Sequence, residues 1–302
     1  MTYNTYEKLS TFSEYAKIVR DTSFFSFGKI PTRINNRVVP VGNRNHVNDL
    51  GKYSNEIVGV ICTPELVESI PRSLGCAVSK NPNEFIFKAS RILLERRDYF
   101  WREFESEIHE TAIIHPTAYI SKYNVRIGEG ANIGPNAVVE EGTSMGANCF
   151  VGPNTTIGTS AYEIVDVEGV ARLMPQCGGV RIGDNVTFLS NVTVARCCFP
   201  TVTEIGDQCS FDNLVHVGHD SVLGRRVKMT ACSMISGRVT LEDDVYVGPN
   251  VTVSNGLTVG RQARISLGSV VTKNVQAGAT VTGYFAIDHA RFLKSMASFR
   301  RD

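Results

Sequence analysis

A six-residue repeat constrains this chain more than any other feature. From Ile205 to Val271, every sixth residue is large and apolar. The run is Ile205, Phe211, Val217, Leu223, Met229, Ile235, Leu241, Val247, Val253, Val259, Ile265 and Val271. The same spacing appears earlier, at Ile127, Ile133, Val139, Met145, Val151, Ile157, Ile182, Phe188 and Val194. Helices repeat near 3.6 residues and strands near 2, so a period of six requires the chain to bend after every short strand.

Three such hexads form a triangular coil of 18 residues in which the apolar anchors point inward. Successive coils stack at the strand spacing of about 4.8 Å. Glycine and asparagine are expected at the corners because they tolerate a positive φ. The repeat therefore predicts a mainly β protein, a left-handed parallel β-helix over residues 109–283. The left hand is that of hexapeptide-repeat proteins and departs from the usual right-handed crossover. Chance periodicity in a β-rich sandwich does not account for so long an unbroken run.

Two segments interrupt the repeat. Residues 158–181 lie between two anchors, and residues 195–204 lengthen another coil. Insertions in a solenoid emerge as loops and often form its binding face, although they can also be plain surface loops.

The flanks of the repeat have a different character. Residues 1–108 read as a small α/β domain, possibly one that binds a nucleotide or sugar, with helices expected at 65–74 and 83–105. At the other end, residues 284–302 are predicted to form a helix carrying several basic residues.

Composition excludes several classes of protein. The net charge is +1, from 31 basic and 30 acidic residues, which does not favour nucleic acid as a partner. No apolar run is long enough for a membrane span, and the first residues do not resemble a signal peptide, so a cytoplasmic location is expected. The eight cysteines are scattered and form no CxxC pair, which favours reduced thiols over disulfides or a thiolate zinc site.

The repeat also converts sequence positions into spatial neighbours. One corner of successive coils reads Arg196, His219, Gly237, Asn255 and Lys273. This column leaves His219 open between a proton-transfer role and a structural one. His216 falls in another slot, below Met234 and Thr252, where a structural role or substrate contact is expected. Histidines spaced by three can bind zinc, but the remaining histidines do not complete such a set, and we expect no metal.

Several stretches carry a family resemblance. "IHPTAYISKYNVRIGEGANIGPNAVV", "VRIGDNV", "DNLVHVGHDSVLG" and "GSVVTKNVQAGATVTGYFA" resemble the UDP-3-O-acylglucosamine N-acyltransferases of lipid A synthesis. The resemblance implies an α/β domain, a left-handed β-helix and a C-terminal helix, assembled as a homotrimer. It also implies that His219 is the general base and that the backbone N–H of Gly237 stabilises the oxyanion.

The resemblance implies a reaction as well. An acyl group passes from acyl-CoA (acetyl-CoA, for example) or acyl carrier protein to the amine of a nucleotide-linked amino sugar, for surface polysaccharide or lipid A. The thioester is a co-substrate, and no bound cofactor is expected. We assign the substrate-binding and donor-binding residues together. They are His216, Asn255, Asp212 and Arg196 for the substrate, and Lys273 and Gly256 for the acyl donor.

Some positions differ from the family pattern. Gly256 stands where members commonly carry a second histidine, and Pro40 and His46 stand near the positions of aromatic residues that stack on uracil. These differences favour a short-chain transferase acting on another amino sugar. The side chain of Asp220 is expected to point away from His219, as in an extended strand. Alternatives are an O-acetyltransferase on the same scaffold and a non-catalytic β-helix used for assembly. Direct transfer is preferred to an acyl-enzyme on Cys197 or Cys198.

Overall fold

The computed structural model describes residues 5–96, 98–283, 286, 288–291 and 293–294. The helix predicted at 284–302 falls largely on residues outside this set. Within the described part of the chain, no helix is long and apolar enough to cross a membrane.

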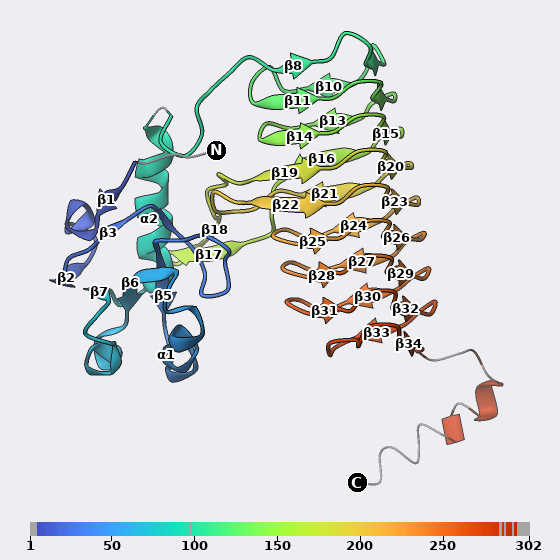
Figure 1. Ribbon diagram of the computed structural model, residues 1–302. Coiled ribbons are helices and arrows are strands. Elements are labelled where there is room, and N and C mark those ends of the chain that lie inside the picture. The colour runs from blue at the N-terminus through green and yellow to red at the C-terminus, as the bar shows by residue number, and fades with distance from the viewer. Residues whose placement is uncertain (1–4, 97, 284–285, 287, 292, 295–302) are drawn as a thin grey trace.

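The centre of the molecule is a parallel β-helix built from three sheets (Figure 1). The first sheet contains β8 (Glu107–Ile108), β11 (Val125–Ile127), β14 (Thr143–Met145), β19 (Gly179–Ile182), β22 (Val202–Ile205), β25 (Val222–Leu223), β28 (Thr240–Leu241) and β31 (Thr258–Val259). The second contains β9 (Ile113–Ile114), β12 (Asn132–Ile133), β15 (Phe150–Val151), β20 (Thr187–Phe188), β23 (Ser210–Phe211), β26 (Lys228–Met229), β29 (Tyr246–Val247), β32 (Arg264–Ile265) and β34 (Thr280–Val281). The third contains β10 (Tyr119–Ile120), β13 (Val138–Val139), β16 (Thr156–Thr159), β21 (Thr193–Ala195), β24 (His216–Val217), β27 (Met234–Ile235), β30 (Thr252–Val253) and β33 (Val270–Val271).

The repeat explains this architecture. The anchors from Ile127 to Val271 are buried and form one continuous core along the axis. Corner residues adopt a positive φ, and many of them are asparagine, such as Asn136 and Asn154. This conformation turns the chain sharply enough to start the next sheet after two to four paired residues. The predicted left-handed parallel β-helix is confirmed.

The N-terminal part forms a five-stranded sheet in the order β2-β7-β6-β5-β4. Its strands are β2 (Lys17–Arg20), β4 (Ser26–Phe27), β5 (Arg37–Val41), β6 (Ile57–Cys62) and β7 (Gly75–Val78), and β1 (Glu7–Lys8) pairs with β3 (Ser23–Phe24) beside it. The helices are α1 (Arg44–Leu50), α2 (Pro82–Glu95) and the 3₁₀ helices η1 (Leu9–Phe12), η2 (Gly51–Tyr53) and η3 (Pro64–Ser69). Asn81 caps α2, because its side chain accepts a hydrogen bond from the Glu84 N–H.

Helix α2 is shorter than the sequence predicts. It ends at Glu95 rather than near 105, and Tyr99 and Phe100 after it are buried. The aromatic residues that read as a continued helix instead fill the junction with the β-helix. The other predicted helix, at 65–74, is the 3₁₀ helix η3 and ends at Ser69.

The first insertion joins the two parts of the molecule. It forms an antiparallel hairpin of β17 (Ile164–Val167) and β18 (Val170–Leu173), which extends towards α2 (Figure 1). Val165 and, from the second insertion, Phe199 are buried in the same apolar cluster as residues of the N-terminal part. Asn81 also donates a hydrogen bond to the Asp166 carbonyl at 3.1 Å. The insertions therefore fix the N-terminal part against one side of the β-helix.

Candidate active site

His219 lies at the corner between β24 and β25, and its ring covers Gly237 on the next coil. Strand register aligns Val217 with Ile235, Ile235 with Val253, and Val253 with Val271 on successive coils. The corner residues that follow these anchors therefore stack in one column, as the repeat requires. A Cβ added at Gly237 would come within 2.6 Å of His219 Nε2. Only glycine leaves room for the imidazole at this place, so Nε2 and the Gly237 backbone lie side by side.

Asp220 orients this imidazole, contrary to the sequence expectation. His219 Nδ1 lies 2.6 Å from Asp220 Oδ2. The expectation assumed extended backbone, in which neighbouring side chains alternate, but Asp220 has a φ of 58° at the corner. The left-handed turn brings the two side chains together. Because a carboxylate only accepts, Nδ1 carries the proton and the lone pair of Nε2 faces Gly237.

The same carboxylate lies against a buried cluster of thiols. The Asp220 N–H donates to Thr203 Oγ1 at 3.0 Å, and Asp220 Oδ1 is buried with no partner among the described residues. Burial, and then the negative charge of Asp220, raise the pKa of Cys197 well above its ordinary value. Burial likewise raises the pKa of Cys198 to about 12. Both thiols stay protonated at neutral pH and are poor nucleophiles.

His216 occupies a different surface. It stands on the outer side of β24, between Thr193 and Met234 of the adjacent strands. Burial, and then the electrostatic effect of His219, lower the pKa of His216, so its imidazole is neutral at neutral pH. The two histidines thus occupy different positions on the coil, and their side chains still interact electrostatically.

The other predicted residues are dispersed. Asn255 and Lys273 are exposed along the column, and Gly256 follows with a φ of 71° and open space around its Cβ position. Arg196 is buried, and its guanidinium donates to the Glu141 carbonyl and pairs with the Glu141 carboxylate at 3.4 Å. Asp212 lies at another corner, after β23, where its carboxylate accepts from the Asn213 N–H at 2.7 Å.

A pocket of about 410 Å³ contains Pro40 and His46, which the family resemblance placed near the uracil-stacking positions. It is lined mainly by the N-terminal part and is reached by Arg238 from the β-helix. The Arg238 N–H donates to the His219 carbonyl at 2.7 Å, so the pocket adjoins the candidate base. Its cationic and aromatic lining residues are Lys29, His46, Lys52, Tyr53 and Arg238. Sequence reasoning did not single out Arg238, although it directly follows Gly237.

The described residues contain no group of three or more histidine, cysteine, aspartate or glutamate side chains placed to hold a metal ion.

Comparison with known proteins agrees with the fold. Residues 124–159 match the family model for the bacterial transferase hexapeptide (six repeats), and residues 238–273 match that for the hexapeptide repeat of succinyl-transferase. None of the curated proteins matches the sequence.

Two solved structures illustrate what this chain is similar to. UDP-N-acetylglucosamine acyltransferase from Campylobacter jejuni is 20% identical, with a TM-score of 0.50 over 65% of this chain and 82% of that one. LpxA from Acinetobacter baumannii is 22% identical, with a TM-score of 0.48 over 65% of this chain and 78% of that one. At this identity the first likeness shows the fold. The chain thus contains hexapeptide repeats, and its coils form a left-handed parallel β-helix.

Proposed function

We propose that this protein is an N-acyltransferase that moves an acyl group from a thioester to the amine of a nucleotide-linked amino sugar. The observation that carries the proposal is the corner at His219, where an oriented imidazole faces the backbone of Gly237. A base and an oxyanion donor side by side are what acyl transfer to an amine requires.

His219 acts first, as the base. An amine attacks a thioester only through its lone pair, and it loses a proton as the C–N bond forms. Nε2 of His219 takes this proton. Asp220 holds Nδ1–H and stabilises the imidazolium that results, so it positions the ring without contacting the substrate.

Gly237 stabilises the tetrahedral intermediate that the attack forms, whose former carbonyl oxygen carries a negative charge. Its N–H has no acceptor among the described residues and is available for that oxygen. Losing such a donor typically costs about 3 kcal/mol of transition-state stabilisation. Collapse of the intermediate breaks the C–S bond, and the imidazolium of His219 returns its proton to the sulfur, so that coenzyme A or the carrier protein leaves as the thiol.

The acceptor nucleotide is proposed to occupy the pocket beside Arg238. Lys29 and Lys52 supply positive charge for phosphates, although each is also paired, with Glu163 and Asp49 respectively. Tyr53 offers a ring for the base. The acyl donor is proposed to lie along the exposed column towards Asn255 and Lys273. We further propose a homotrimer, which light scattering measures directly.

The test is a screen by mass spectrometry. Nucleotide-linked amino sugars are incubated with the full chain and either acetyl-coenzyme A or a long-chain acyl carrier protein. The proposal expects an acyl mass added to an amino sugar and none added to the matched sugar that lacks the amine. Acylation of both acceptors would mean transfer to oxygen, and no acylation of any acceptor would favour an assembly role.

A further inference from the structure

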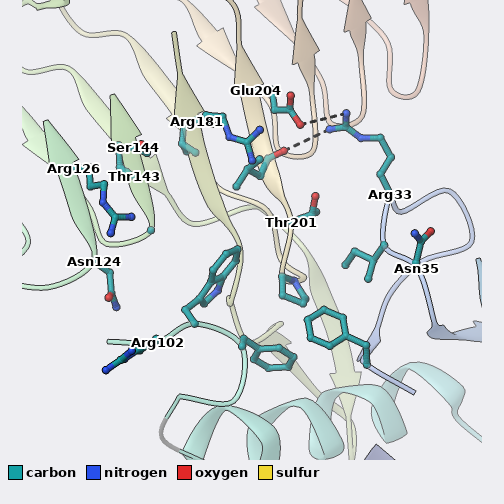
Figure 2. A pocket seen from close by; sticks show the side chains of 18 of the residues that line it. Arg33, Asn35, Arg102, Asn124, Arg126, Thr143, Ser144, Arg181, Thr201 and Glu204 are labelled. Carbon is teal, nitrogen blue, oxygen red and sulfur yellow. Dashed lines mark hydrogen bonds and ion pairs between the residues drawn. The ribbon is translucent and has the colours of Figure 1, made fainter. Parts of the chain in front are cut away.

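A second cleft, distinct from the pocket beside Arg238, lies between the N-terminal part and the first sheet. Figure 2 shows side chains that line it. Its volume is about 580 Å³. Most of its lining comes from three segments, which are the loop before β5, the aromatic residues after α2, and the strands β11, β14, β19 and β22. We call it the interdomain cleft.

The floor of the interdomain cleft carries an ordered row of polar side chains. Register aligns Arg126 with Ser144, Ser144 with Arg181, and Arg181 with Glu204 on successive strands. Adjacent members are about 4.8 Å apart at the backbone. Thr143, beside Ser144, is buried and faces the core of the β-helix instead. The row therefore places the Ser144 hydroxyl between the guanidinium groups of Arg126 and Arg181.

The lining of the cleft carries more positive than negative charge. Arg126 pairs with Glu107 at 2.8 Å, and Arg33, reaching across from the N-terminal part, pairs with Glu204 at 3.8 Å (Figure 2). Arg181 is exposed to the cleft between these pairs, and no ion pair of it occurs within the described part of the chain. Among the described residues that line the cleft, Glu204 is the single acidic one. A positive group in a partly enclosed site attracts an anion, and guanidinium favours phosphate.

The opposite wall is aromatic. Phe25 and Phe100 pack edge to face at 6.4 Å, and Trp101 lies next to them in the sequence. Such a wall suits a planar ring. We propose that the interdomain cleft binds the diphosphate of a nucleotide, with Arg181 on a phosphate and the ring against the aromatic wall. This chemistry occurs both in coenzyme A and in free nucleoside diphosphates.

Trp101 makes the proposal directly testable, because it is the only tryptophan in the chain. Its emission is followed while pyrophosphate, uridine diphosphate or coenzyme A is added to the full-length protein at physiological salt. We expect a saturable change with at least one of the two ring-bearing ligands and weaker binding of pyrophosphate. The ligand bound more tightly identifies the source of the diphosphate.

Three variants locate the binding. Arg181→Gln should weaken it about tenfold or more, since one charge-assisted pair of hydrogen bonds is lost. Arg225→Gln removes an equal charge from an exposed site elsewhere and should leave the affinity unchanged. Lys52→Gln, in the other pocket, should also leave the Trp101 signal intact.

The proposal fails if no ligand gives a saturable signal, or if the Arg181 and Arg225 variants weaken binding equally. It also fails if Lys52→Gln alone removes the signal. None of these readouts depends on catalysis, so a protein inactive in the acyl-transfer screen can still bind here, and the two proposals fail separately.

Discussion

At the scale of single residues, the candidate site depends on one backbone conformation. Asp220 reaches His219 because its φ is positive, and Gly237 accommodates the ring because it has no Cβ. The repeat placed His219 and Gly237 in one column, since that follows from counting residues. The orientation of Asp220 was predicted wrongly, because strand alternation does not continue into a corner.

Gly237→Ala tests the packing of the ring. Its φ is not in the left-handed region, so the backbone accepts alanine, but the new Cβ would overlap His219 Nε2. Displacing a catalytic group by about 1 Å can cost roughly 100-fold in rate, and we expect a loss of that order in acyl transfer with little change in melting temperature.

The matched control for this variant is Gly51→Ala. Its Cβ meets nothing within 4 Å, and its rate should equal that of the wild type. Full activity of Gly237→Ala would show that acyl transfer does not require the His219 imidazole at its position beside Gly237.

The cysteines give a second residue-scale prediction. Burial keeps Cys197 and Cys198 protonated, whereas Cys232 is exposed. Iodoacetamide at neutral pH should therefore add a single carbamidomethyl group to the native protein, and none to Cys232→Ser, as measured by intact mass. Labelling of Cys197 or Cys198 in the native state would reopen the acyl-enzyme mechanism.

At the scale of elements, sequence and structure agree where contacts are local. Each coil is specified by its own hexads, so the β-helix could be predicted from anchors such as Val217 and Ile235. The end of α2 and the hairpin of β17 and β18 could not be. Their positions depend on burial between segments far apart in the chain, as when Phe199 packs among residues of the N-terminal part.

Phe199→Ala tests this junction. Removing a buried phenylalanine typically costs about 3–5 kcal/mol of unfolding free energy. We expect a loss in that range in urea denaturation followed by the emission of Trp101, whose indole N–H donates to the Cys177 carbonyl at the junction. Tyr162→Ala, at a side chain that is 86% exposed, should change the stability by less than about 0.5 kcal/mol. Equal effects of the two variants would contradict the packing described.

At the scale of the whole molecule, the N-terminal part and the β-helix together form two hollows. One adjoins His219 through Arg238, and the other lies over the first sheet around Arg181. The sequence indicated a separate α/β domain, but the hollows arise only when the insertions dock it against the β-helix. That docking depends on tertiary contacts and could not be read from the repeat.

The most direct measurement compares acyl transfer by His219→Ala, His216→Ala and the wild type, with the amino sugar that the screen identifies. Loss of a general base typically lowers the rate by about 10²–10⁴-fold, and the account predicts such a loss for His219→Ala. His216→Ala should lose much less, because His216 stands outside the column. A His219→Ala variant that transfers the acyl group near the wild-type rate would contradict the account.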